Sequence, residues 1–220
     1  MTASLPFDPA PRFDVAFRRQ LEQLYRWRRD VRRFRTEPLD DGLLDRLIEL
    51  AMLAPSVGNS QPWRFVKVDD AERRARVRDN FEQCNRAALA EYEGERAALY
   101  ARLKLAGLDR APVHLAVFAD EGTDCGGQLG RRTMPETLTW SVVGAVHAFW
   151  LVARAHGVGV GWVSILDAGT VRDALALPAN WSLVAYLCIG WPEEEHLDPE
   201  LERAGWQRRF GDLARVIVQR

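Results

Sequence analysis

Six arginines lie within ten residues of the chain, between Arg26 and Arg35. A guanidinium group offers two parallel N–H donors that match two phosphate oxygens, so such a run can bind a phosphate dianion. If this run were helical, Arg28 and Arg32 would share one face with Arg35. The same charges could instead form a solvated helix end or a nucleic-acid patch. The run therefore indicates an anion site without identifying the anion.

Asp30 is the one carboxylate inside this arginine run. A carboxylate in such a place is either a local salt-bridge partner or an acid–base group held in position. Neighbouring arginines lower the pKa of an aspartate and burial raises it, so the sequence leaves the protonation state of Asp30 open.

A second group of polar residues lies in the proline-bounded loop 55–63. Ser56, Asn59 and Gln61 offer donors and acceptors that suit the polar edge of a heterocycle. Gly58 would let the backbone come close to a flat ligand. A simple turn between two prolines explains the same residues, and both interpretations stay open on this loop alone.

Three alternating glycines, at 157, 159 and 161, precede Ser164 in a predicted strand. Glycine weakens a strand, so we expect another backbone or a ring to approach closely here. Gly157 could also end a helix, and Ser164 could donate to a ring or cap the next helix. Near the end of the chain, Arg209 could add a phosphate ligand or face solvent.

Composition excludes several classes of protein. The net charge of −1 gives no support to nucleic-acid or anionic membrane binding. We see no stretch of about 20 uninterrupted apolar residues and no signal peptide. Three distant cysteines and four scattered histidines form neither a disulfide framework nor a metal motif. We therefore expect a cytoplasmic protein without metal.

Hydrophobic periodicity places these motifs on an α+β fold in a single domain, 1–220. Helices and strands alternate along the chain, and the tail from about residue 191 is a polar extension. We predict helices at 15–29, between Pro38 and Pro55, within 70–106, at 136–156 and at 168–176. We predict strands at 63–68, 113–119, 158–165 and 183–189.

The order of these motifs resembles the nitroreductase-like flavoprotein superfamily. Within it, Arg28-Arg29-Asp30-Val31-Arg32, Gln61-Pro62-Trp63 and Gly159 through Ser164 are similar to the BluB-type 5,6-dimethylbenzimidazole synthases. Ordinary nitroreductases usually carry serine where this chain has Asp30. The resemblance covers about residues 15–210.

The resemblance implies a central mixed sheet flanked by helices, in an intertwined homodimer with FMN at the subunit interface. It implies that reduced FMN and O2 are substrates, and that the flavin is broken down to 5,6-dimethylbenzimidazole and D-erythrose 4-phosphate. A separate flavin reductase would supply the reduced FMN, and NAD(P)H could take part indirectly, while its direct use stays open. Neither metal, membrane nor nucleic acid is implied.

The resemblance also implies roles for individual residues. Asp30 would be the acid–base group near the ribityl chain, and Ser164 would bond to the ring or relay a proton. Lys104 would lie near the flavin, in a helical lid at about 85–110. The expected FMN-binding residues are Arg28, Arg29, Asp30, Val31, Arg32, Ser56, Gly58, Gln61, Lys104, Ser164 and Arg209.

Two other functions stay open. The first is an NAD(P)H-dependent FMN reductase or nitroreductase on the same fold. The second is a flavin-binding or basic interaction module without turnover.

Overall fold

The computed structural model describes residues 10–103 and 107–220. Its centre is a four-stranded sheet in the order β1-β2-β4-β3. The strands are β1 (Trp63–Lys67), β2 (Val113–Asp120), β3 (Gly159–Val163) and β4 (Trp181–Gly190). The predicted α+β class is confirmed, and all four strands lie within three residues of their predicted ends.

The strand pairs are antiparallel, whereas the resemblance implied a mixed sheet. β1 pairs with β2, β2 with β4, and β3 with β4, each antiparallel. Parallel pairing within the described residues is confined to an isolated bridge between Asp30 and Val160. It stays isolated because the chain then turns away, and Phe34 makes its own antiparallel bridge to Pro192.

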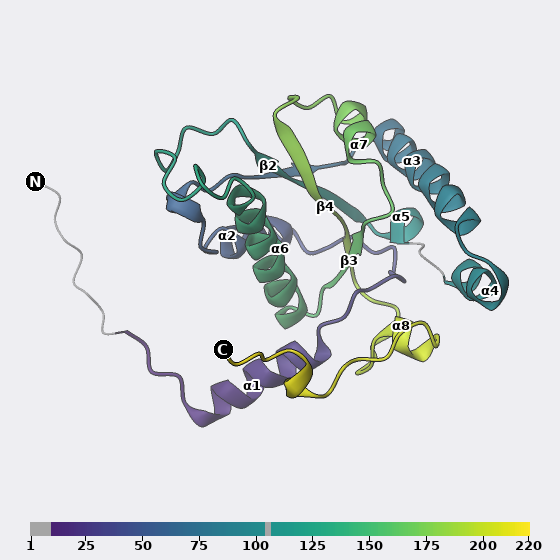
Figure 1. Cartoon of the computed structure of the whole chain (residues 1–220), viewed down its shortest axis with the longest axis horizontal. Helices are drawn as coiled ribbons and strands as arrows, with labels where there is room; N and C mark the ends of the chain where they lie inside the picture. The colour runs from purple at the N-terminus through teal and green to yellow at the C-terminus, as the bar shows by residue number, and fades with distance from the viewer. Residues whose placement is uncertain (1–9, 104–106) are drawn as a thin grey trace, which may run out of the picture.

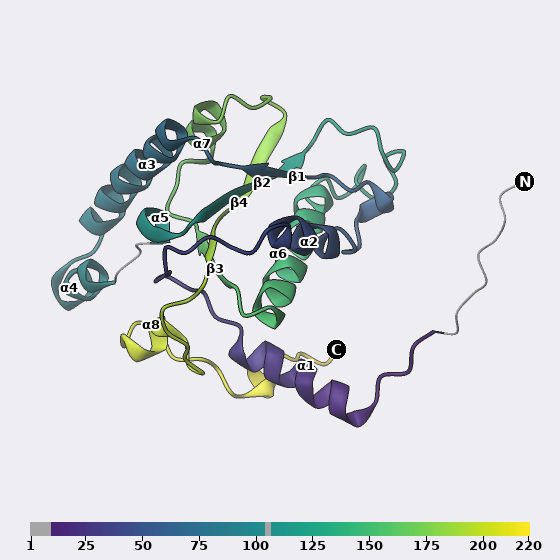
Figure 2. The same cartoon turned by 180° about the vertical axis from the view of Figure 1, so that it is seen from behind.

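Helices cover both faces of this sheet, with α2 and α6 on one side and α3, α5 and α7 on the other (Figure 1). Figure 2 shows the same layers from behind, with α1 and the C-terminal tail lying beyond the end of α6. The α-helices are α1 (Val15–Trp27), α2 (Leu43–Ala51), α3 (Ala71–Ala90), α4 (Gly94–Arg102), α5 (Gly107–Arg110), α6 (Thr137–Ala155), α7 (Ala168–Ala174) and α8 (Glu200–Arg203), with 3-10 turns η1 (Val57–Asn59) and η2 (Leu213–Arg215).

Alternation along β2 explains the two layers. Leu115 and Val117 face the core cluster that contains α6, whereas Ala116 and Phe118 face the cluster that contains α7. Successive side chains of a strand point to opposite faces, so a fully apolar strand must be covered on both. α6 is also long and apolar enough to cross a membrane by length and composition alone. Here it packs against the sheet, and Val142, Val146 and other residues are buried.

α1 ends two residues earlier than predicted. Its last residue is Trp27, and Arg28 already has an extended backbone with φ −64° and ψ 124°. The arginines from 28 onward therefore share no helix face, which corrects that expectation. The physical reason is that Val31 bonds to a strand instead of continuing the helix: its N–H donates to Val160 O at 3.0 Å.

The predicted close approach at the alternating glycines is confirmed, and the approaching group is the backbone at Val31. A Cβ added to Gly161 would lie 2.2 Å from Val31 O. A Cβ added to Gly159 would meet only the Val31 side chain, at 3.0 Å or more. Gly157 ends α6 with φ +75°, as the sequence also indicated.

We predict that Gly161→Ala destabilises the fold by about 1–3 kcal/mol or more, because the added methyl group would collide with a backbone carbonyl. Urea unfolding at neutral pH measures the change. Gly159→Ala is the matched control and should cost clearly less, because the Val31 side chain can shift. Equal costs at the two positions would contradict the proposed backbone contact.

Candidate active site

The segment 28–32 is held between α6 and the edge of β3. On one side, Trp150 of α6 donates its indole N–H to Arg29 O at 3.1 Å. On the other, the Asp30 backbone bridges to Val160 and the Val31 N–H bonds to the same residue. Backbone contacts on both sides fix the direction of every side chain in the segment.

Asp30 has a carboxyl group bound at both oxygens. Oδ1 accepts the Trp162 backbone N–H at 2.9 Å, and Oδ2 accepts Arg32 Nε at 3.3 Å. Burial is the largest influence and raises the pKa of Asp30, while these two donors lower it by less. The part of the side chain that stays open faces two pockets. Such a group can exchange a proton nearer to neutral pH than an ordinary aspartate.

Arg32 lines both pockets together with Asp30, and the larger of the two is the Arg32 cavity. Its side chain is 12% exposed, and among the described residues its Nη1 has no hydrogen-bond partner. A buried guanidinium N–H without an acceptor is costly, so a ligand oxygen is its natural partner. The cavity has a volume of about 180 Å³, and Gly161, Ser164 and Cys188 also line it.

Ser164 is the second residue of the expected catalytic pair. It is exposed, lies one residue beyond β3, and shares the cavity with Asp30. The structure therefore brings this predicted pair of catalytic residues to one cavity.

Arg28 lies outside this cavity, half-buried against the ring of Trp150, with its Cζ 5.0 Å from the ring centroid. Burial lowers the pKa of Arg28 most, and the positive charge of Arg209 lowers it further. A cation whose charged form is destabilised by a neighbouring positive charge is a natural partner for an anion. The structure therefore brings Arg209 from the tail to the arginine run.

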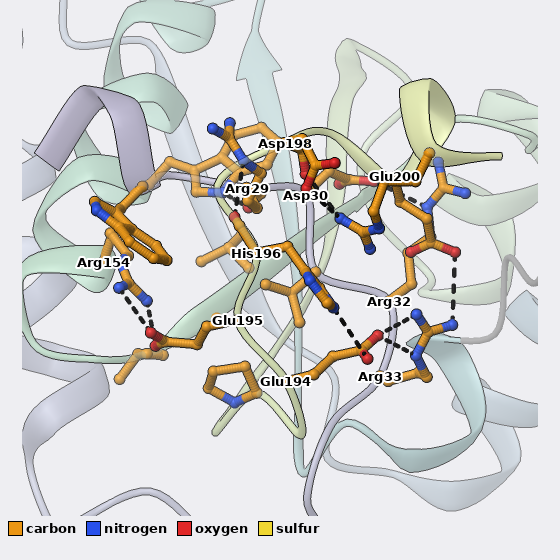
Figure 3. A pocket seen from close by; sticks show the side chains of 18 residues that line it. Arg29, Asp30, Arg32, Arg33, Arg154, Glu194, Glu195, His196, Asp198 and Glu200 are labelled. Atoms are coloured by element: carbon orange, nitrogen blue, oxygen red, sulfur yellow. Dashed lines mark hydrogen bonds and ion pairs between the residues drawn. The ribbon is translucent and has the colours of Figure 1, made fainter. Parts of the chain in front are cut away.

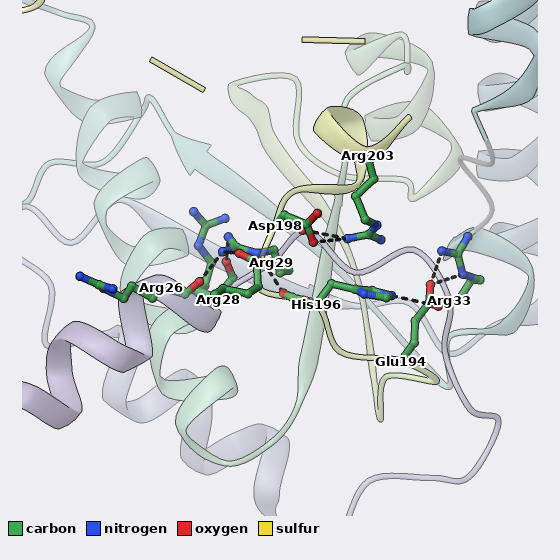
Figure 4. Close-up of polar contacts among 9 residues, drawn as sticks. Arg26, Arg28, Arg29, Arg33, Glu194, His196, Asp198 and Arg203 are labelled. Atoms are coloured by element: carbon green, nitrogen blue, oxygen red, sulfur yellow. Dashed lines mark hydrogen bonds and ion pairs between the residues drawn. The ribbon is translucent and has the colours of Figure 1, made fainter. Parts of the chain in front are cut away.

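Arg29 has a different environment, because backbone carbonyls of this chain occupy its donors. It bonds to Arg28 O at 2.6 Å and His196 O at 3.2 Å, and also to Arg26 O and Leu197 O (Figure 4). Arg29 thus ties the start of the tail to the end of α1. This use leaves it little capacity for a phosphate.

A second, smaller pocket beside Asp30 is closed by ion pairs (Figure 3). Arg33 pairs with Glu194 and Glu200, and Arg154 pairs with Glu195. Its volume is about 50 Å³, and its charges are matched internally. We therefore place the ligand site at Arg28 and in the Arg32 cavity instead.

The loop residues Ser56, Gly58 and Gln61 are not brought to this site within one chain. Val57 bonds to Ser141 near the start of α6, whereas the Asp30 segment contacts Trp150. These two positions are nine residues apart on the helix, which is roughly 13 Å along its axis. Ser56 is used locally, because its Oγ accepts the Gln61 N–H at 3.0 Å.

Lys104 lies outside the described residues, as does part of the expected lid at 85–110. The described part consists of the end of α3, α4 and α5. Phe81 of α3 and Gly107 of α5 line the Asp30 cavity. α3 and α5 therefore each contribute a residue to the wall of the cavity, and the lid stays a prediction.

Sequence reasoning missed two contributors to the site. Trp150 lies on α6, where its ring supports Arg28 and its N–H holds Arg29. Trp162 contributes its backbone N–H to Asp30. Trp150 could have been suspected, since a buried indole N–H needs an acceptor. The role of Trp162 could not have been predicted, because the residue type does not indicate what a backbone N–H will bind.

Comparisons with known proteins identify related sequences. The model of the nitroreductase family matches residues 25–191. The 5,6-dimethylbenzimidazole synthase of Rhodospirillum rubrum is 61% identical, covering 90% of this chain and 94% of the relative. That of Rhodobacter capsulatus is 48% identical over 90% and 96%.

Solved structures show the same fold. Oxidized iodotyrosine deiodinase bound to FMN and 3-iodo-L-tyrosine superposes with a TM-score of 0.68 at 26% identity, covering 80% of this chain and 91% of the other. A BluB-like flavoprotein from Clostridium difficile 630 gives 0.66 at 20% identity, covering 90% and 98%. With a family model matching three quarters of its length and relatives far above 30% identity, the chain belongs to the nitroreductase family.

Proposed function

We propose that the chain is a 5,6-dimethylbenzimidazole synthase. It would use O2 to fragment reduced FMN into 5,6-dimethylbenzimidazole, the lower ligand of vitamin B12, and D-erythrose 4-phosphate. The observation that carries this proposal is the carboxylate of Asp30, held at a cavity shared with Ser164. The 61% identity to a relative of that name supports it.

The charges fit FMN as a substrate. Arg28 and Arg209 would hold the phosphate, since these like charges lie close enough to lower the pKa of Arg28. Arg32 would donate its free Nη1 to an oxygen of the flavin. Arg29 would act mainly by holding the segment in place, and Val31 would contribute backbone.

Asp30 would perform the proton transfer. Breaking a C–C bond of the ribityl chain in retro-aldol fashion needs a base at a hydroxyl group, and a carboxylate of raised pKa suits a group that both takes and returns a proton. Ser164 would hydrogen-bond to the ring or relay a proton. The helices that cover the cavity would exclude bulk water from the reaction with O2.

The separation of the loop 55–63 from Asp30 supports a homodimer with two shared sites. Ser56, Gly58 and Gln61 would then reach the flavin of the partner subunit. The outer face of α6 offers exposed Trp140 and Val143 for such an interface. One domain, 1–220, would carry all of this, with a lid that includes Lys104 and a tail that reaches Arg28.

The cellular setting completes the proposal. The enzyme would work in the cytoplasm without a metal. A separate reductase would supply reduced FMN, and NAD(P)H would act only through that reductase.

The alternative function is an NAD(P)H-dependent FMN reductase or nitroreductase. A relative named NADH dehydrogenase from Thermus thermophilus favours it, with 30% identity over 76% of this chain and 84% of the relative. Asp30 argues against it, because a hydride transfer to flavin needs no carboxylate at the ribityl chain.

We expect the purified protein, mixed with chemically reduced FMN and air, to form 5,6-dimethylbenzimidazole. Chromatography of the products together with the flavin absorbance measures this. The control is the same mixture without protein. Reoxidation to intact FMN with no dimethylbenzimidazole would refute the synthase, and NAD(P)H-driven reduction of a nitroaromatic would favour the alternative.

Asp30→Asn should keep FMN binding and lower the rate of product formation about 10²–10⁴-fold, because the amide cannot take up the proton. Flavin titration and the product assay measure the two effects separately. Loss of FMN binding as well would show that Asp30 is structural.

The same variant gives a pH test. The pKa of Asp30 is raised in the folded protein, so its ionisation costs stability as pH rises through the folded pKa. Relative to the unmodified protein, Asp30→Asn should therefore gain stability as the pH rises above about 4, where an ordinary aspartate ionises. Urea unfolding at several pH values measures the difference, and a pH-independent difference would contradict the assigned shift.

Arg28→Ala should weaken FMN about 10- to 100-fold, because a charge-assisted hydrogen bond contributes about 1.5–3 kcal/mol. Riboflavin, which lacks the phosphate, should lose far less affinity. Arg26→Ala is the matched control from the same run, since its side chain is exposed and pairs with Glu22. Equal losses for FMN and riboflavin would refute phosphate recognition by Arg28.

A further inference from the structure

The loop 56–61 has a strained backbone. Gly58, Asn59 and Gln61 have φ values of +57°, +54° and +46°. For residues other than glycine this region costs on the order of 1–3 kcal/mol each, and it persists only where the surroundings enforce it. Contacts from outside the loop are therefore needed to hold this conformation.

The turn 126–130 lies directly against this loop, backbone to backbone. A Cβ added to Gly126 would lie 2.6 Å from Gly58 O, and one added to Gly130 would lie 2.8 Å from Val57 Cγ2. In the other direction, a Cβ on Gly58 would lie 3.0 Å from both Gly126 O and Leu129 O. Contact this close is possible only because glycines face each other, so the shape of the turn limits the shape of the loop.

Ser141 of α6 holds the loop from a second side. Its Oγ accepts the Val57 N–H at 3.0 Å and donates to Thr137 O at 2.6 Å. Ser141 is 8% exposed, so it links the start of the loop to the core helix from a buried position.

The turn itself is fixed by a buried side chain. Arg131 is 7% exposed, and its Nε donates to Gln128 Oε1 at 2.9 Å. Gln128 has a φ of +65°, so this bond stabilises the left-handed backbone that the turn needs. The turn 126–130 is thus more rigid than a glycine-rich surface turn would be without this bond.

We propose that the turn 126–130 and Ser141 are positioning elements that hold the loop 56–61 in its flavin-binding shape. This inference rests on the proposed function, in which Ser56, Gly58 and Gln61 contact the flavin. Neither the turn nor Ser141 would touch the flavin. Because the loop would address the ring and ribityl chain, loosening it should weaken FMN and riboflavin by the same factor.

Gly126→Ala tests the proposal, with Gly127→Ala as the matched control. Both glycines have positive φ, +79° and +54°, but a Cβ on Gly127 would meet nothing within 4 Å. Relative to Gly127→Ala, we expect Gly126→Ala to raise the Kd of FMN and of riboflavin by about 10-fold or more. Quenching of flavin fluorescence measures both constants, on samples whose folding is checked by circular dichroism.

Ser141→Ala is a milder second variant, which decides the question if Gly126→Ala fails to fold. Losing one hydrogen bond to the loop should raise the Kd of both flavins about 3- to 10-fold. Equal Kd values for the Gly126 and Gly127 variants, no change in the Ser141 variant, or a loss confined to FMN would each overturn the proposal while the synthase stands. If the unmodified protein binds neither flavin, the proposed function fails first and this inference fails with it.

Discussion

The site depends on one backbone contact, that of the Val31 carbonyl with the bare Cα of Gly161. No side chain fits between them, since a Cβ on Gly161 would lie 2.2 Å from that carbonyl oxygen. The contact places the Asp30 carboxyl within reach of the Trp162 N–H, and beside it the Val31 N–H bonds to Val160 O of β3, which ends α1. Together these contacts account for the position of the Asp30 carboxyl and for the extended course of the arginine run.

Once the run is extended, its arginines reach different surroundings and do different work. Arg32 points inward and pairs with Asp30, Arg29 binds backbone carbonyls, and Arg33 pairs with Glu194 and Glu200. Arg28 remains on the ring of Trp150 beside Arg209. On a helix, the spacing of these arginines would decide which of them share a face. In the extended segment, the partner of each arginine depends on the neighbouring element that its side chain meets. An arginine-rich stretch therefore predicts an anion site more safely than it predicts which arginine binds the anion.

Local patterns were enough to predict most of the elements. The apolar repeat of α6 and the apolar run of β2 were enough to predict where each element begins and ends. The alternating glycines predicted a close approach without identifying the approaching group. What could not be predicted depends on pairings distant in sequence. The end of α1 is decided by Val160, more than 100 residues away, and the support of Arg28 by Trp150. The contact of Gly126 with Gly58 also joins segments far apart in the sequence, and no property of either loop alone reveals it.

Close contacts between a glycine and another stretch of backbone occur near both ends of α6. Near its end, glycines of β3 let the Asp30 segment dock, and near its start, the turn 126–130 lets the loop 56–61 dock. A backbone-to-backbone contact has no rotamers to lose, so it places polar groups with little loss of side-chain entropy. It also tolerates little change, because any added atom collides with a carbonyl oxygen. A reaction that must present a carboxylate to one bond of a bound molecule would benefit from this rigidity, since misplacement of about 1 Å can cost on the order of 100-fold in rate.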